Sequence, residues 1–208
     1  MQILSPNQVG GIVLCGGQST RMGRPKLSLT FGDETMLGRV VRIVGEVVSP
    51  VVVVAAGTQE LPSLPPGTIV ARDDAEGKGP LAGLAAGLAA LNGRADAAFV
   101  AACDVPLLKP AFIRALIDAM GTHEMAVPRG ADYYHPLAAV YRTMLEARVR
   151  GLIAEGRLRS QLLVQASDVS AVDLADLRAV DPELDSLRNV NTPEEYEAAL
   201  RSAGFSSG

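Results

Sequence analysis

The stretch Val9-Gly-Gly-Ile-Val-Leu-Cys-Gly-Gly-Gln-Ser-Thr-Arg-Met-Gly-Arg-Pro-Lys26 joins an apolar run to a loop rich in glycine and basic residues. The run over residues 9–14 predicts a first strand. In the loop, Gly16, Gly17 and a third glycine lack a Cβ, so successive backbone N–H groups can point at an oxyanion. Arg21 and Lys26 add full positive charges. The stretch therefore predicts a phosphate-binding turn after a strand.

Spacing excludes two familiar phosphate loops. A P-loop ends in Gly-Lys-Ser/Thr, whereas Lys26 follows Pro25 and precedes Leu27. A dinucleotide fingerprint is completed by an acid at the tip of the second strand, and the predicted second strand, residues 50–56, runs into Ala-Ala-Gly. This argues against a dinucleotide-dependent oxidoreductase. A long loop with its own cations suits a triphosphate better.

Composition limits the class of partner. The 208 residues fit one domain, 1–208, and a net charge of −4 argues against a general nucleic-acid surface. Two cysteines are too few for a disulfide framework, no secretory leader pattern opens the chain, and no apolar run reaches the roughly 20 residues that span a bilayer. We therefore expect a cytoplasmic protein with a small anionic ligand, no nucleic acid and no membrane.

The pattern along the chain alternates strands and helices. Strands are expected at 9–15, 50–56, 68–71, 97–103, 124–128, 136–141 and 169–173, and helices at about 35–48, 80–92, 109–120, 143–155 and 193–202. Strands such as Val51-Val-Val-Val-Ala-Ala are apolar on both faces, as a helix-covered parallel sheet requires. The predicted fold is α/β, Rossmann-like and doubly wound, with a mostly parallel sheet.

Three polar features follow strands whose carboxyl ends should share one edge of such a sheet: the glycine loop, Asp73 and Asp104. Mg²⁺ binds through one or two carboxylates together with phosphate oxygens, so Asp104 facing a triphosphate loop predicts a magnesium site. The alternative is that Asp104 caps the turn into Val105.

Other residues around this edge carry weaker signals. Lys26 and Arg21 are candidates for contacting the triphosphate. Lys26 would do so as a point charge, and Arg21 through two parallel hydrogen bonds from its guanidinium. Gly79 begins a helix whose small residues admit a nucleobase or ribose, or else pack tightly on the sheet. Asp73 suits a guanine edge or a ribose hydroxyl. Asn191 is a second candidate metal ligand or a plain turn residue, and we expect one of the amides at 189 and 191 to face inward and the other outward.

The loop from 14 to 26 resembles the signature of the sugar-phosphate-type nucleotidyltransferases, and within them it is similar to the molybdenum cofactor guanylyltransferase family. Four motifs in order carry the resemblance over nearly the whole chain: the loop, Asp73 followed by Gly79-Pro-Leu-Ala-Gly, Cys103-Asp-Val-Pro106, and Asn189-Val-Asn-Thr-Pro-Glu-Glu195. It implies a Rossmann-like sheet with a small added β region.

The resemblance also implies roles. Leu14, Cys15 and Gly16 would contact the nucleotide, Lys26 its phosphates, Asp73 the nucleoside, and Asp104 both nucleotide and Mg²⁺. The implied reaction is transfer of GMP from GTP to the phosphate of molybdopterin, with release of pyrophosphate. Two alternatives are a cytidylyltransferase acting on molybdopterin or another phosphorylated small molecule, and a non-catalytic nucleotide sensor.

Overall fold

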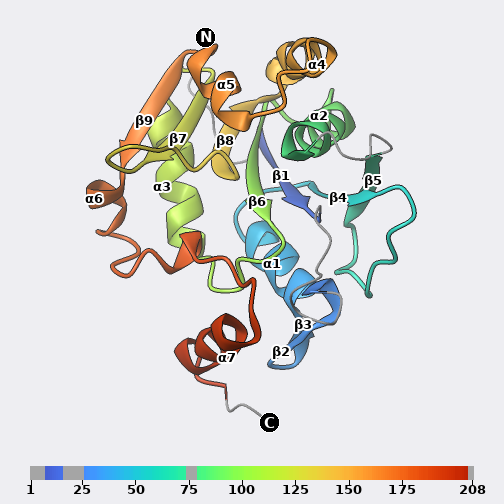
Figure 1. Ribbon diagram of the computed structural model, residues 1–208, viewed down its shortest axis with the longest axis vertical. Coiled ribbons are helices and arrows are strands. Elements are labelled where there is room, and N and C mark those ends of the chain that lie inside the picture. Colours follow the sequence, from blue (N-terminus) through green and yellow to red (C-terminus); the bar gives the residue numbers. More distant parts are fainter. Residues whose placement is uncertain (1–7, 16–25, 74–78, 206–208) are drawn as a thin grey trace.

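The computed structural model describes residues 8–15, 26–73 and 79–205, and a seven-stranded sheet forms its centre (Figure 1). The strands of this sheet are β1 (Val9–Leu14), β4 (Val51–Ala56), β5 (Ile69–Asp73), β6 (Ala97–Ala102), β7 (Met125–Arg129), β8 (Ala138–Arg142) and β9 (Val169–Asp173). Their order is β5-β4-β1-β6-β8-β7-β9, and only β8 pairs antiparallel with its neighbours. The predicted α/β class with a mostly parallel sheet is confirmed.

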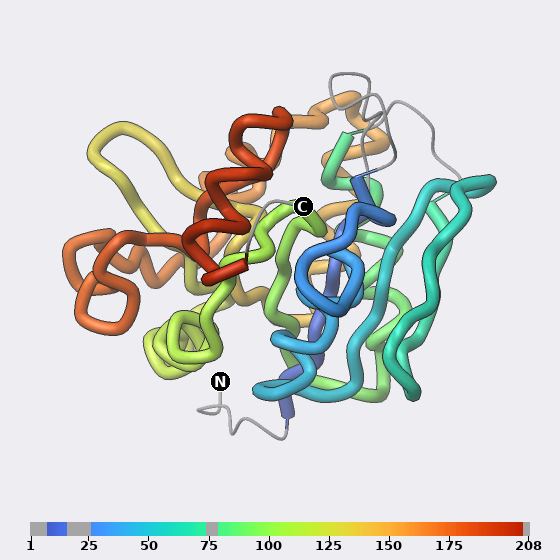
Figure 2. The backbone as a smooth tube through the Cα atoms, turned by 90° about the horizontal axis from the view of Figure 1, so that it is seen from below, coloured from blue at the N-terminus to red at the C-terminus, as the bar shows by residue number. Residues whose placement is uncertain are grey.

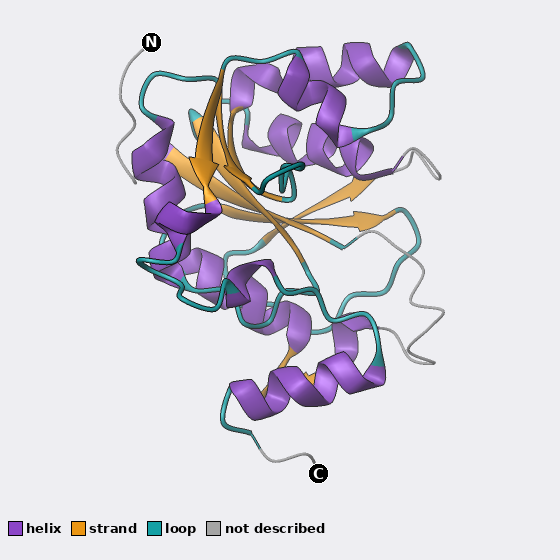
Figure 3. Ribbon diagram, turned by 60° about the vertical axis from the view of Figure 1, so that its left-hand side comes forward, coloured by secondary structure: helices purple, strands orange, loops and turns teal. Residues whose placement is uncertain are grey.

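Helices cover both faces of the sheet. They are α1 (Met36–Gly45), α2 (Gly79–Leu91), α3 (Pro110–Met120), α4 (Glu146–Ala154), α5 (Ser160–Gln165), α6 (Leu174–Leu177) and α7 (Pro193–Ser202), with 3-10 turns η3 (Lys26–Ser28), η4 (Thr143–Leu145) and η5 (Asp185–Leu187). Buried side chains of α1 and α3 pack on one face, and those of α2, α4 and α5 on the other. Figure 3 shows the sheet between these two helical layers.

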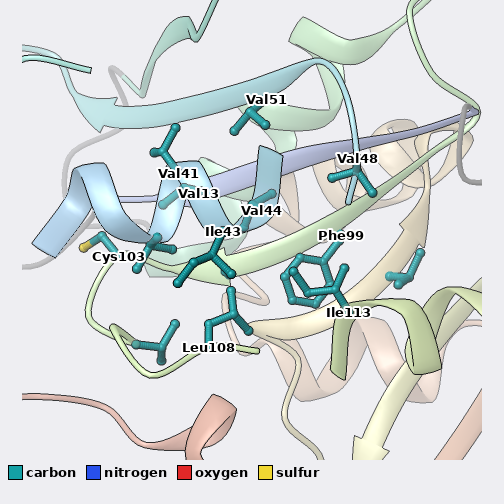
Figure 4. Packing of buried hydrophobic residues seen from close by; sticks show 14 of the residues in the cluster. Val13, Val41, Ile43, Val44, Val48, Val51, Phe99, Cys103, Leu108 and Ile113 are labelled. Atoms are coloured by element: carbon teal, nitrogen blue, oxygen red, sulfur yellow. The ribbon is translucent and has the colours of Figure 1, made fainter. Parts of the chain in front are cut away.

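The core is aliphatic, and the first strand sits at its centre. Val13 of β1 belongs to one buried cluster with Val41 and Val44 of α1 and with Phe99 of β6 (Figure 4). A Cβ at Gly11 would lie 2.4 Å from Val44 Cγ1. Because glycine has no Cβ, α1 can approach β1 this closely.

A smaller unit stands apart from the three layers. The hairpin β2 (Thr30–Phe31) and β3 (Glu34–Thr35) lies beside α7, and it forms the small added β region (Figure 1). Phe31 meets Phe205 edge to face, with ring centroids 5.6 Å apart, and these rings belong to a third apolar cluster with Leu200. The C-terminal segment up to Phe205 is therefore docked on a segment that follows the first strand, and Figure 2 shows α7 beside that segment.

Most predicted boundaries agree with the structure within a few residues. Helix α3 begins at Pro110, and α7 begins after Thr192, whose side chain completes a capping box with Glu195. The predicted helix over 143–155 is instead η4 followed by α4. Neither α5 nor a strand at residues 30–35 was predicted from the sequence. Among the described residues, no helix has the length and apolar character to cross a membrane.

Candidate active site

The strand ends bring the predicted site residues to one edge of the sheet. Because β1, β4, β5 and β6 run parallel, Leu14, Asp73 and the segment after Ala102 all lie at their carboxyl ends. Asp73 is the last residue of β5, and Asp104 follows β6 by two residues. Gly16, Gly17 and Arg21 lie outside the described residues. The predicted roles of all these residues remain predictions.

A cluster of four polar side chains forms where β1 and β6 end. Lys26 Nζ donates to Asn191 Oδ1 at 2.6 Å and lies 3.4 Å from Asp104 Oδ2. The other carboxylate oxygen of Asp104 accepts from Asn189 Nδ2 at 2.7 Å. The side chains of Lys26 and Asp104 are only 15% and 16% exposed, so this ion pair is screened less than a surface pair.

The cluster joins distant parts of the chain, and backbone contacts hold it. The Val190 N–H donates to the Asp104 carbonyl at 2.8 Å, which fixes the C-terminal segment to the turn after β6. Glu195 Oε2 accepts from the backbone N–H of Asn191 at 2.7 Å and of Thr192 at 3.1 Å. The capping box of α7 therefore also orients Asn191 toward Lys26.

Arg39 of α1 connects the cluster to the docked end of the chain. Its Nε donates to the Pro106 carbonyl at 2.7 Å, just beyond Asp104. Its guanidinium lies 5.1 Å from the centroid of the Phe31 ring and 5.7 Å from that of Phe205. Arg39 thereby braces the turn after β6 against the hairpin and the C-terminal segment.

Two details differ from the sequence expectation. The amides at 189 and 191 do not face opposite ways, because both contact the Lys26–Asp104 pair. Residues i and i+2 of an extended segment project to the same side, which is the signal that the expectation of opposite faces overlooked. Neither Asn189 nor Arg39 was among the predicted site residues, since nothing in the sequence ties either to Asp104.

The two residues at the end of β1 face the core. Leu14 and Cys15 are 7% and 1% exposed, and the N–H of Cys15 donates to the Val54 carbonyl at 2.8 Å. A hydrogen bond with Cys15, together with burial, raises the pKa of the Cys103 thiol well above its usual value. Cys103 therefore stays protonated at neutral pH, which is the state of a structural cysteine rather than a nucleophile.

The start of α2 lies at the same edge. Gly79 has a positive φ of 67°, and the carbonyl of Leu158, just before α5, is 3.9 Å from where its Cβ would be. Asp73 lies on β5 and pairs in register with Ala56 of β4, so β4 and β1 lie between Asp73 and the strand that precedes Asp104. The predicted nucleoside residue and the predicted metal residue therefore stand on either side of β1 and β4.

The donors around Asp104 suit a hard divalent cation. The Asp104 carboxylate and the Asn191 amide oxygen already converge on one cation, the Lys26 ammonium. Carboxylate and amide oxygens are the ligand types for such ions, and Mg²⁺ takes its remaining ligands from phosphates and water. Among the described residues, no three His, Cys, Asp or Glu side chains lie close enough together to hold a metal ion.

Comparison with known proteins gives the class and then the family. The pattern of the MobA-like NTP transferase domain matches residues 11–169. A probable molybdenum cofactor guanylyltransferase of Mycobacterium ulcerans is 39% identical over 197 residues, covering 93% of this chain and 94% of the relative. The chain is thus a nucleotidyltransferase by fold and sequence. It belongs to the MobA-like NTP transferase family.

Solved structures share the fold. Molybdopterin-guanine dinucleotide biosynthesis protein A from Archaeoglobus fulgidus superposes with a TM-score of 0.75 at 23% identity, covering 94% of this chain and 98% of that one. Rv0371C of Mycobacterium tuberculosis, solved as a complex with manganese, gives a TM-score of 0.57 at 22% identity, covering 94% of this chain and all of that one. Asn189 and Asn191 lie beyond the family match, which ends at residue 169.

Proposed function

We propose that this protein transfers GMP from GTP to the phosphate of molybdopterin, releasing pyrophosphate and forming the guanine dinucleotide cofactor, with Mg²⁺ as its metal. The observation that carries the proposal is the cluster of Lys26, Asp104 and Asn191 at the carboxyl edge of the sheet. The choice of guanine and of molybdopterin is supported by the relative that is 39% identical over nearly the whole chain.

The reaction joins two anions, and the site supplies charge to offset their repulsion. An oxygen of the molybdopterin phosphate forms a bond to the α-phosphorus of GTP while the bond from that phosphorus to the bridging oxygen breaks. The electron pair leaves with pyrophosphate. A phosphate monoester with its second pKa near 6 is already ionised at neutral pH, so no general base is needed.

Lys26 and Asp104 have complementary parts in this scheme. Lys26 presents its ammonium to the phosphates, and its short contact with Asn191 fixes where that charge lies. Asp104 and Asn191 would hold Mg²⁺, which when bound neutralises charge on the reacting phosphates. Asn189 donates to the second oxygen of Asp104 and so orients the carboxylate. Asp73 is proposed to hold the nucleoside, and Leu14, Cys15, Gly16, Gly17 and Gly79 to border the nucleotide.

The direct test offers molybdopterin and each of GTP, CTP, ATP and UTP to the purified protein with Mg²⁺ and measures pyrophosphate release. We expect release with GTP alone, and no release after chelation of the metal. Release with CTP but not GTP would identify a cytidylyltransferase instead. Binding of a nucleotide without turnover on any acceptor would identify a sensor.

A substitution separates the role of the metal residue from folding. Asp104→Ala should abolish turnover while the far-UV circular dichroism and the thermal transition remain those of a folded protein. Asp96→Ala is a matched control, because Asp96 precedes β6 at the opposite edge of the sheet and pairs there with Gln8. Near-normal activity of Asp104→Ala would refute the proposed metal role.

A further inference from the structure

The chain beyond Asp104 makes a second ionic contact, at the start of α3. The central residue of this contact is Asp181, whose side chain is fully buried. Lys109 Nζ donates to Asp181 Oδ1 at 2.7 Å, and the N–H of Ser186 donates to Oδ2 at 2.8 Å. Burying a charge is costly unless it is paired and hydrogen-bonded, and both oxygens of this carboxylate have partners. Charge-assisted hydrogen bonds of this kind are among the stronger ones in proteins.

Main-chain contacts complete this arrangement. The backbone N–H of Lys109 donates to Ser186 Oγ at 3.0 Å, and Ser186 is itself fully buried. The N–H of Asp185 donates to Asp181 Oδ1 at 3.2 Å, and Lys109 Nζ lies 3.2 Å from Asp185 Oδ2. Leu184 has a positive φ of 53°, which a residue other than glycine keeps only where its surroundings hold it. In Figure 1 the chain between α6 and α7 accordingly runs past the lower end of α3.

Both partners of the contact are charged at neutral pH. Burial by itself would raise the pKa of Asp181, but the hydrogen bonds from Lys109 and Ser186 outweigh it and lower the pKa. The hydrogen bond to Asp181 in turn raises the pKa of Lys109. The ion pair is therefore intact at pH 7.

The segment that carries the two amides of the polar cluster is tied down on both sides. On one side it continues from the loop that Asp181 holds, and Asn189 donates from Nδ2 to Asp104 Oδ1 at 2.7 Å. On the other side Glu195 of α7 accepts from the backbone N–H of Asn191 at 2.7 Å. The positions of both amides relative to Asp104 thus depend on an anchor at α3 and an anchor at α7.

We propose that Asp181 is a positioning residue for the metal site: by fixing residues 181–186 to the start of α3, its carboxylate holds the amides of Asn189 and Asn191 against Asp104. This inference rests on the proposed function, which assigns Mg²⁺ to Asp104 and Asn191. Asp181 acts through the two amides and contacts neither metal nor substrate. Without this anchor, a smaller fraction of the molecules has both amides in place, and the apparent affinity for the metal falls by that fraction.

Glu124 offers a matched control, because it makes a contact of the same kind at the opposite edge of the sheet, just before β7. Its side chain is 16% exposed, it pairs with Arg148, and it accepts the backbone N–H of Asp168 at 2.9 Å. The two cations, Arg148 and Lys109, are 38% and 37% exposed. Glu124→Gln should therefore lower the stability of the fold, as Asp181→Asn does, and leave the metal site unchanged.

The first readout is hydrogen exchange of the Val190 backbone amide, which donates to the Asp104 carbonyl. We expect exchange about tenfold faster in Asp181→Asn and near the wild-type rate in Glu124→Gln. The second readout is Mn²⁺ binding in the presence of GTP, followed by electron paramagnetic resonance. Its Kd should rise about three- to tenfold in Asp181→Asn. In an Asn191→Ala background the same substitution should add less than about twofold, because it acts through that amide.

Wild-type Mn²⁺ affinity in folded Asp181→Asn, or an equal loss in Glu124→Gln, would overturn the inference. If Asp181→Asn fails to fold by circular dichroism, Ser186→Ala takes its place, because it removes only the hydroxyl that accepts from the Lys109 N–H. Weaker Mn²⁺ binding in Ser186→Ala decides for the inference, and wild-type affinity decides against it. A wild-type protein that binds GTP and Mn²⁺ but transfers no GMP would refute the proposed function alone, since neither readout depends on turnover.

Discussion

Gly87→Ala in the middle of α2 tests how the sheet and its helices pack. A Cβ at Gly87 would lie 2.7 Å from Ile12 Cγ2 and 2.9 Å from its Cδ1. Ile12 is fully buried in β1, and its branched Cβ means that Cγ2 moves only when the whole side chain changes rotamer. The added methyl group therefore forces α2 and β1 apart.

Two opposing effects set the change in the free energy of unfolding that Gly87→Ala causes. Alanine is favoured over glycine inside a helix by about 1 kcal/mol, and overpacking a core costs about 1–3 kcal/mol. The net change at Gly87 is a loss of about 0–2 kcal/mol in the free energy of unfolding. Gly151 in α4 is the matched control, because no heavy atom lies within 4 Å of its Cβ position. Gly151→Ala should therefore raise the free energy of unfolding by about 1 kcal/mol, the helix preference of alanine over glycine.

The two variants should therefore differ by about 2 kcal/mol, which corresponds to about 4–8 °C in Tm for a domain of this size. Thermal and urea unfolding followed by circular dichroism measure both quantities. The packing argument is refuted if Gly87→Ala raises the Tm as much as Gly151→Ala does.

Three other substitutions address the ion pairs, the docked end of the chain and the metal. A hydrogen bond from Arg148 and its charge lower the pKa of the Glu124 carboxyl, so the pair stabilises the fold above the unfolded pKa of 4.5 and loses this effect as pH falls through the folded pKa. Glu124→Gln should cost about 0.5–1 kcal/mol at pH 7 and less as the pH falls through the folded pKa, and a loss in urea melts that does not change with pH would contradict this. Phe205→Ala removes the ring that meets Phe31 and Arg39 and should lower the free energy of unfolding by about 1–3 kcal/mol together with kcat; unchanged values of both would show that the docked end does not brace the site. Asn191→Ala should raise the Mg²⁺ concentration for half-maximal turnover about tenfold, and an unchanged metal titration would remove Asn191 from the metal site.

The parts of the fold that follow from local pattern were predictable. Long apolar strands such as Val51–Ala56 and a capped helix start such as Thr192-Pro193 carry their signal within a few residues. The strands β2 and β3 have two residues each, and α5 has six, so none is long enough to show a period. Their formation depends on tertiary contacts, such as those of Phe31 with Tyr196 and Phe205.

The site was predictable where strand ends determine position, and not where separate segments meet. Asp104 and Asp73 follow strands, so a parallel sheet brings them to one edge. Asn189 reaches the turn after β6 beside the hydrogen bond from the Val190 N–H to the Asp104 carbonyl, and Arg39 reaches it from α1 through the Pro106 carbonyl. One sequence does not show which distant segments make these contacts. The burial of His135 Nε2 without a hydrogen-bond partner likewise depends on the path of the β7–β8 connection, which the sequence does not show.

Isotope tracing follows the transfer of GMP to molybdopterin atom by atom. The protein is incubated with molybdopterin, Mg²⁺ and GTP labelled at either the α- or the γ-phosphorus. We predict that the α-label appears in the molybdopterin product and the γ-label in pyrophosphate, and that Asp104→Ala gives neither. Appearance of the γ-label in molybdopterin or in free phosphate, with no α-label transferred, would contradict the account.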